Sequence, residues 1–226
     1  MQEKTFALSR RALLRTAAVG AVATAATAAI PSVVMAAEGT ADTSKIRNFD
    51  MIEAFYREYP KKLAAVRGTL NRPLTLTEKI LFTHLYHPES LREFKRGADY
   101  IELRPDRAGT HDIGGPMAII QFLSSGKERI ALPAALVCDH LVQANVGAIP
   151  DLKVAEKGNV ETYEFLRDVS RRYGFDFWPA GSGICHQVFM ENYNFPGCMM
   201  LVTDSHTPTA CGMGMLAIGV GGADLV

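Results

Sequence analysis

The chain of 226 residues is long enough to bury the core of one compact domain. Its 24 basic and 24 acidic side chains cancel, and neither sign forms a long run, so we expect no nucleic-acid surface and no anionic-membrane surface. The four cysteines form no Cys-x-x-Cys pair, which argues against a zinc knuckle or a complete iron–sulfur motif.

Residues 1–40 differ in composition from the rest, and we interpret them as a targeting leader. Arg10, Arg11 and Arg15 precede an uncharged, alanine-rich stretch that ends before Glu38. Alanine, glycine and threonine contribute little transfer free energy, so no stable membrane anchor is expected. Paired arginines before such a run resemble a twin-arginine export signal, which predicts a periplasmic protein. A transit peptide for the mitochondrial matrix is the alternative.

Residues 41–226 are expected to form one α/β domain that begins with helices. Apolar side chains between Phe49 and Val66 recur at helical spacing, and we expect Pro60 to divide or bend this helix. A second helix follows, in which Thr75 or Thr77 can cap the first turn and which Pro88 would end.

Two short apolar runs, residues 130–137 and 198–202, predict buried strands. An amphipathic helix is expected between them from Asn159 onward, ended by Gly174. Strand, helix and strand in this order favour a layered α/β domain with a mainly parallel sheet. Ligands bind beyond the carboxyl ends of such strands, where Asp139-His140 and Asp204-Ser205-His206 follow the two runs. The sequence therefore predicts a single cleft.

Four of the six histidines stand in segments rich in glycine, serine or aspartate, namely His111, His140, His186 and His206. An aspartate beside an imidazole can hold its tautomer and favour its protonated form, which suits proton transfer to a leaving hydroxyl. The alternative for each Asp-His step is a loop turn in which the aspartate caps backbone amides.

Three motifs resemble those of the aconitase family in order and spacing: Cys-Asp-His-Leu at 138–141, Gly-Ser-Gly-Ile-Cys-His-Gln at 181–187 and Thr-Asp-Ser-His-Thr-Pro at 203–208. The resemblance, which runs from about Met51 to Val226, implies an N-terminal three-layer α/β domain with a central, mainly parallel sheet, preceded by helices. It also implies reversible dehydration and hydration of citrate to isocitrate, through cis-aconitate, on a 4Fe–4S cluster. A homoaconitase- or methylcitrate-type hydro-lyase and a non-catalytic binding remnant are the alternatives.

The resemblance also assigns roles to individual residues. His140, supported by Asp139, would protonate the departing hydroxyl, and His186 would pair with Asp204. Ser205 would contact a substrate carboxylate, and His206 would have its carboxylate partner beyond Val226. The expected catalytic residues are therefore Asp139, His140, His186, Asp204 and His206, and the expected substrate contacts are His111, Asp204, Ser205 and His206.

Two positions depart from the family pattern. Residues 111–114 read His-Asp-Ile-Gly instead of the common Gln-Asp-Ala-Thr, and Thr209 replaces a frequent asparagine. His111 can still donate a hydrogen bond to a carboxylate, so the change would retune substrate recognition.

The resemblance further implies that the cluster cysteines, the carboxylate-binding arginines and the serine base of the family lie in later segments. We therefore expect a truncated chain that is inactive alone and contributes no metal ligand, with the cluster in the full-length parent and its own cysteines in packing roles. The expected partners are a small tricarboxylate and the remaining aconitase domains. We expect a monomer without nucleic acid and without a stable membrane anchor.

Overall fold

The computed structural model describes residues 48–226, so the predicted leader at residues 1–40 lies outside them and its boundary stays a prediction. The described chain begins with helix α3, Phe49–Leu70. Pro60 lies inside this uninterrupted helix, so of the two expected outcomes the division of the helix is wrong, and a bend at Pro60 stays a prediction. Phe55 packs against the ring of Phe195 at a centroid distance of 5.1 Å, and such tertiary contacts outweigh the local cost of a helical proline.

The second helix, α4, comprises Leu76–Thr83, and Thr75 is its N-cap. The Thr75 hydroxyl accepts the Glu78 N–H while the Glu78 carboxylate accepts the Thr75 N–H, which completes a capping box. The helix ends well before Pro88, contrary to expectation, because the His84 ring folds back onto the carbonyl oxygen of Ile80. Pro88 instead begins the short 3-10 helix η1, Pro88–Ser90.

A five-stranded sheet forms the centre of the domain, and every pairing in it is parallel. The predicted runs 130–137 and 198–202 correspond to β2 and β4, although β2 starts only after Pro133, which has no N–H to donate. The strand order is β3-β2-β1-β4-β5. The strands are β1 Arg107–His111, β2 Ala134–Val137, β3 Asp176–Trp178, β4 Met199–Val202 and β5 Leu216–Gly219.

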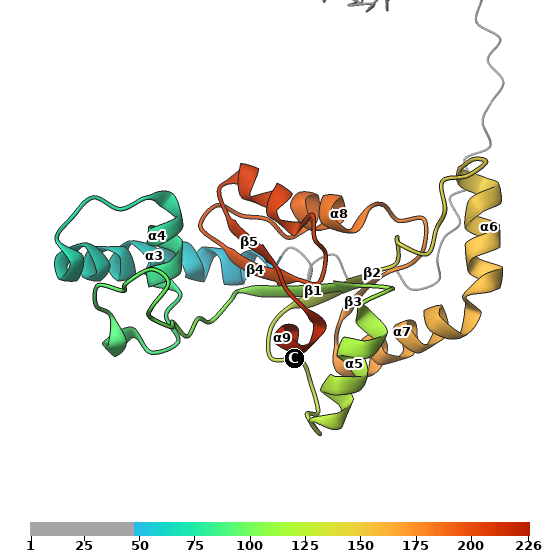
Figure 1. The fold of residues 1–226 in the computed structure, drawn as a ribbon, viewed down its shortest axis with the longest axis horizontal. Coiled ribbons are helices and arrows are strands. Elements are labelled where there is room, and N and C mark those ends of the chain that lie inside the picture. The colour runs from blue at the N-terminus through green and yellow to red at the C-terminus, as the bar shows by residue number, and fades with distance from the viewer. Residues whose placement is uncertain (1–47) are drawn as a thin grey trace, which may run out of the picture. The chain divides into compact units, whose positions relative to one another are not determined.

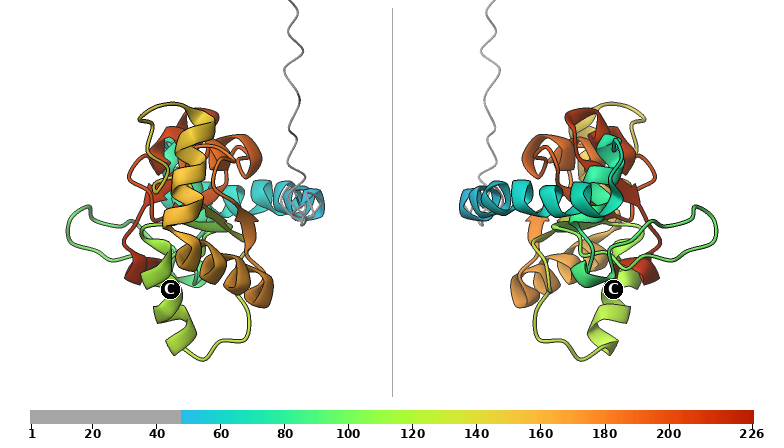
Figure 2. Two further views of the ribbon diagram at one scale, coloured as in Figure 1. Left: turned by 90° about the vertical axis from the view of Figure 1, so that its right-hand side faces the viewer. Right: turned by 90° about the vertical axis from the view of Figure 1, so that its left-hand side faces the viewer.

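Helices cover both faces of this sheet. Figure 1 shows α8 on one face and α5, α7 and α9 on the other, and both views in Figure 2 keep α5 opposite the α8 layer. The helix predicted from Asn159 is α7, and Gly174 ends it in the left-handed region at φ 93°, as expected. The helices after α4 are α5 Gly115–Ser124, α6 Ala148–Gly158, α7 Val160–Tyr173, α8 Cys185–Asn192, the 3-10 helix η2 Thr207–Met213 and α9 Gly222–Leu225. The α/β fold class is therefore confirmed.

Strand β2 is fully buried, and its alternating side chains join two separate cores. Ala135 and Val137 pack in the cluster that contains α8, whereas Leu136 packs with α5 and α7. Near the middle of β1, Gly109 lies directly under the ring of Phe189, where any Cβ would overlap that ring. This close approach seats α8 on the sheet and carries its first turn toward the carboxyl ends of the strands.

The topology also defines where a ligand is expected. From the central strand β1, the chain adds β2 and β3 on one side and β4 and β5 on the other. The carboxyl ends of β1 and β4 therefore flank the switch point, the usual ligand position in open parallel sheets. Within residues 48–226, none of the helices is long and apolar enough to span a bilayer.

Candidate active site

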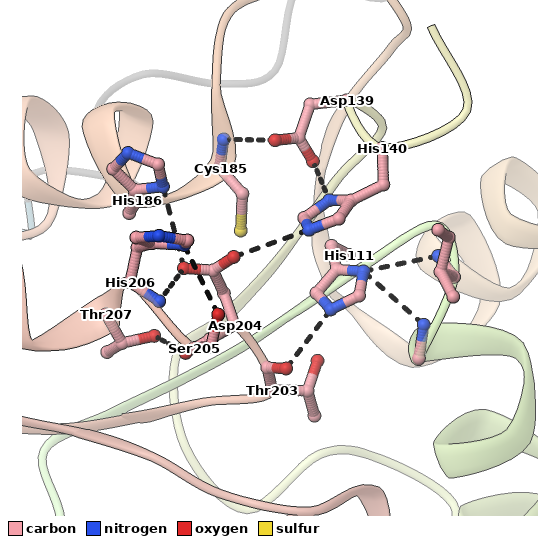
Figure 3. Close-up of polar contacts among 12 residues, drawn as sticks. His111, Asp139, His140, Cys185, His186, Thr203, Asp204, Ser205, His206 and Thr207 are labelled. Atoms are coloured by element: carbon pink, nitrogen blue, oxygen red, sulfur yellow. Dashed lines mark hydrogen bonds and ion pairs between the residues drawn. The ribbon is translucent and has the colours of Figure 1, made fainter. Parts of the chain in front are cut away.

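The predicted site residues come together at the carboxyl edge of the sheet. His111 is the last residue of β1, Asp139 and His140 follow β2, and Asp204 follows β4. His186 lies in the first turn of α8. Figure 3 shows the four imidazoles gathered around the Asp204 carboxylate.

Asp139 and His140 form a side-chain pair, as the adjacent residues suggested. Asp139 Oδ1 lies 2.7 Å from His140 Nδ1, and Asp139 Oδ2 accepts the backbone N–H of Cys185 at 2.7 Å. The carboxylate is thus held from two sides, and it fixes the His140 tautomer with Nδ1 as donor. His140 Nε2 then points to Asp204 Oδ1 at 3.4 Å.

Asp204 is 2 % exposed, and its carboxylate lies within ion-pair distance of two imidazoles, those of His140 and His186. Its second oxygen, Oδ2, lies 3.5 Å from His186 Nδ1 and accepts the backbone N–H of His206 at 2.8 Å. The His186 and His206 rings lie 5.2 Å apart. Asp204 and His206 therefore meet through the backbone, as in a loop turn, while the His206 ring lies 3.2 Å from the Ser205 hydroxyl.

His111 is buried and uses both ring nitrogens within the protein. Nε2 donates to the Thr203 carbonyl oxygen at 3.1 Å, and Nδ1 accepts the backbone N–H of Ile113 at 3.2 Å. Burial, and next the neighbouring His140, lower the pKa of His111. A bond from His111 to a substrate carboxylate would require Nε2–H to leave Thr203, and this predicted role stays a prediction.

Asp112 is a site residue that the sequence reasoning missed. It is 1 % exposed, and its carboxylate accepts the backbone N–H of His140 at 3.0 Å and that of Leu141 at 3.2 Å. Two signals could have found it: its match to the aspartate of the family's Gln-Asp-Ala-Thr pattern and its place directly after a strand. That strand was not predicted, because the segment Arg-Ala-Gly-Thr-His is not an apolar run.

The cysteines of the described chain do not fit an iron–sulfur cluster. Burial raises the pKa of the thiols of Cys138, Cys185 and Cys198, which disfavours the thiolate that a cluster iron binds. The Cys211 sulfur accepts the backbone N–H of Ala217. Two groups of side chains within residues 48–226 could hold a metal ion, and neither contains a cysteine.

The fold and the site define an α/β protein with carboxylate-backed imidazoles at the switch point of a parallel sheet, an arrangement that can transfer protons. The comparisons with known proteins agree with this class. A model of the aconitase family (aconitate hydratase) matches residues 78–226, which is more than half of the chain. The chain belongs to the aconitase family.

Curated relatives cover most of this chain. It is 46% identical over 193 residues to a mitochondrial aconitate hydratase of Gracilaria gracilis, covering 85% of this chain and 24% of the relative. It is 50% identical over 171 residues to a mitochondrial aconitate hydratase of Saccharomyces cerevisiae, covering 76% and 22%. A probable mitochondrial aconitate hydratase of Caenorhabditis elegans is 46% identical over the same length. The chain thus spans about a quarter or less of the length of these relatives.

Proposed function

We propose that this chain is the N-terminal domain of an aconitase-type hydro-lyase that interconverts citrate and isocitrate through cis-aconitate within a longer polypeptide. One observation carries the proposal: His140, which is paired with Asp139, and His186 both lie beside the carboxylate of Asp204. Hydroxide is a poor leaving group, so its departure requires a proton donor, and a histidine backed by a carboxylate can supply that proton. The family membership of the chain and the names of its relatives support the same activity.

In the proposed mechanism, His140 gives its Nε2 proton to the departing hydroxyl, which leaves as water. Asp139 holds Nδ1 and stabilises the charged ring before the transfer. In the reverse direction, the neutral Nε2 takes a proton from the attacking water. Ser205 and His206, both exposed beside Asp204, are positioned to contact substrate carboxylates.

His186 and Asp204 form the second half of this acid–base arrangement. The 3.5 Å separation between His186 Nδ1 and Asp204 Oδ2 would shorten if His186 accepted a proton, because the pair would then be oppositely charged. The 4Fe–4S cluster and the remaining aconitase domains that the family implies would come from the longer protein. A tricarboxylate is the proposed ligand of the histidine site, and the proposed protein is a monomer without nucleic acid.

The departures at His111, Ile113, Gly114 and Thr209 give the citrate-converting activity two alternatives. One is a homoaconitase- or methylcitrate-type hydro-lyase, which would convert a related tricarboxylate. A non-catalytic binding remnant is the other alternative, and it would bind a tricarboxylate without converting it.

The names of the relatives bear on the proposed location. Those cited are described as mitochondrial, which favours the transit peptide over the periplasmic twin-arginine signal for residues 1–40. Sequencing the amino terminus of the mature protein from fractionated cells tests this choice. A mature protein in the periplasm would overturn the mitochondrial assignment.

The decisive test of the activity uses the full-length gene product, with its cluster restored under anaerobic conditions. We expect citrate-dependent formation of cis-aconitate, and we expect His140→Gln and Asp139→Asn to lower kcat by about 10²-fold or more. His87→Gln, which changes an exposed histidine remote from the carboxyl edge, is the control and should retain full activity. Unchanged kcat in His140→Gln would contradict the proposed role, and tight binding of citrate without turnover would favour the remnant.

A further inference from the structure

We propose that His111 is a positioning residue, which orients the ring of His140 by stacking on it, in place of the substrate contact expected for it. The inference rests on the proposed function, in which His140 is the proton donor. The two imidazole rings have centroids 3.8 Å apart and planes 18° apart. Figure 3 shows them side by side, His111 from the end of β1 and His140 from the segment after β2.

The ring of His140 needs such a support. Its side chain is 31% exposed, and the torsion that turns a histidine ring about its Cβ–Cγ bond has broad energy minima. Asp139 holds one ring nitrogen, Nδ1, at 2.7 Å, which fixes one point of the ring but leaves it able to tilt. The stacked face of His111 blocks this tilt on one side. It therefore keeps Nε2 directed toward Asp204, where that nitrogen lies 3.4 Å from Oδ1.

The polar edge of His111 is turned into the protein and away from a substrate. Nε2 donates to the Thr203 carbonyl oxygen at 3.1 Å, and Nδ1 accepts the backbone N–H groups of Ile113 at 3.2 Å and Gly114 at 3.4 Å. His111 is 7 % exposed. A substrate carboxylate could bind Nε2–H only after that group left Thr203, which would leave a carbonyl oxygen without its partner. The face of the ring is thus what His111 offers to the site.

The carbonyl group that holds His111 is itself fixed to the sheet. The Thr203 N–H donates to the Gly109 carbonyl oxygen at 3.2 Å, and the hydroxyls of Thr203 and Thr110 lie 2.9 Å apart. These bonds tie the end of β4 to the neighbouring strand β1. The His111 ring therefore stands on a rigid part of the sheet edge, which is what precise positioning of a reacting group requires.

Gly114 makes room for this arrangement. A Cβ at position 114 would lie 3.5 Å from two atoms of the His111 ring and 3.3 Å from the Thr203 hydroxyl oxygen. The common family pattern has threonine at this position and glutamine at position 111, and a β-branched side chain carries two more heavy atoms on its Cβ. Histidine at 111 and glycine at 114 are therefore a matched pair. The two departures from the family pattern have one cause, the space that the stacked ring needs.

The test compares two substitutions of His111 in the full-length gene product, with its cluster restored under anaerobic conditions. His111→Phe keeps an aromatic ring and loses the polar atoms, whereas His111→Gln keeps polar atoms and loses the ring. We expect His111→Gln to lower kcat by about tenfold or more while KM changes by less than about twofold, because the proton donor is misplaced and binding is not. His111→Phe should retain a higher kcat than His111→Gln. Circular dichroism and cluster absorption correct each rate for the amount of folded, loaded protein.

The matched controls are His87→Gln and His87→Phe, which make the same changes at an exposed histidine remote from the carboxyl edge. Both should leave kcat and KM unchanged. A second comparison tests the pairing with Gly114. Gly114→Thr should lower kcat when His111 is present, because the new side chain crowds the ring, and should cost less in the His111→Gln background.

A substrate contact of His111 would give the opposite pattern, namely a raised KM in His111→Phe and nearly unchanged constants in His111→Gln, and this result would overturn the inference. Additive losses at positions 111 and 114 would overturn the pairing. NMR of the 226-residue chain adds a readout without turnover, since the ring protons of His140 should shift more in His111→Gln than in His111→Phe. Absence of turnover in the unchanged protein would overturn the proposed function as well, whereas turnover with the opposite pattern overturns this inference alone.

Discussion

The imidazole ring of His111 stacks on the ring of His140, with centroids 3.8 Å apart and planes 18° apart. Two cationic rings at this distance would repel each other, so both do not carry a proton at the same time without cost. His111 is the buried member, and its Nδ1 already accepts backbone N–H groups. The stack therefore supports the proposal that His140, and not His111, is the proton donor of the reaction.

We predict that His111 titrates below 6.5, the ordinary pKa of histidine, because burial and then His140 lower its pKa. The unfolded chain then binds this proton more readily than the folded chain does. The contribution of His111 to stability is complete above about pH 6.5 and is lost as the pH falls through the folded pKa. Titration by NMR and urea unfolding across this range measure both effects, and His111→Gln should flatten the slope. A His111 pKa above 6.5 would contradict the prediction.

Asp112→Asn should destabilise the domain by about 1–3 kcal/mol. The Asp112 carboxylate accepts two backbone N–H groups after β2, and an amide can present only one oxygen to them, which leaves a buried group unsatisfied. Urea unfolding measures the loss. Asp168→Asn on the exposed side of α7 is the matched control and should stay within about 0.5 kcal/mol of the parent chain. Equal effects of the two changes would show that the buried bonds do not matter.

Gly109→Ala should cost about 1–3 kcal/mol, because the new methyl group would overlap the ring of Phe189, which is itself 1 % exposed and unable to move away. Gly158→Ala, where the methyl group would meet no atom within 4 Å in the last turn of α6, should instead be neutral or stabilise slightly. Thermal unfolding of both variants gives the comparison. If Phe189→Leu restores part of the loss in a double variant, the clash is its cause.

Thr75→Ala should remove the cap of α4 and destabilise the chain by about 1 kcal/mol. Thr77→Ala, at the exposed second residue of the same helix, is its control and should change stability by less than half as much. Glu78 completes the box, and its bonds to Arg72 and to Thr75 lower its pKa to about 2. The contribution of the Glu78 carboxylate should therefore be complete above pH 4.5, the unperturbed pKa, and should be lost progressively as the pH falls from there to about 2.

Thiol reagents should modify Cys211 first in the folded chain. Cys211 is only half-buried, whereas Cys138, Cys185 and Cys198 are fully buried and their thiol pKa values are raised. Mass spectrometry after brief labelling identifies the modified residue, and labelling in urea should reach all four. Early modification of Cys185 in the native chain would show that the first turn of α8 opens readily.

Sequence patterns predicted the elements whose apolar residues are regular or whose ends are marked. The spacing from Val160 to Tyr173 and the terminal Gly174 defined α7, and Met199 to Val202 defined β4. The central strand β1 was missed because it begins with Arg107, a fully buried cation whose guanidinium lies 5.5 Å from the ring centre of Tyr193. A charged residue such as Arg107 is read from the sequence as exposed, because the aromatic ring that packs against it comes from a distant part of the chain.

The candidate site was predictable to a similar degree. The Asp139–His140 contact follows from adjacency, but Asp204 and His206 are also close in sequence and use the backbone instead. Whether an aspartate and a nearby histidine pair through their side chains or through the backbone depends on the conformation of the turn that contains them. The approach of His140 to Asp204 was anticipated, because both follow predicted parallel strands. The pairing of His186 with Asp204 was anticipated only by the family resemblance, because no local pattern specifies it.

The parallel arrangement of all five strands separates the domain into two rims with different tolerance for change. Amino-terminal strand ends, such as those reached by the loop at residues 125–133, lie away from every histidine of the carboxyl edge. Substitutions in that loop can accumulate without altering ligand binding at the histidine site. A single insertion after β1, β2 or β4 would instead displace residues of that site.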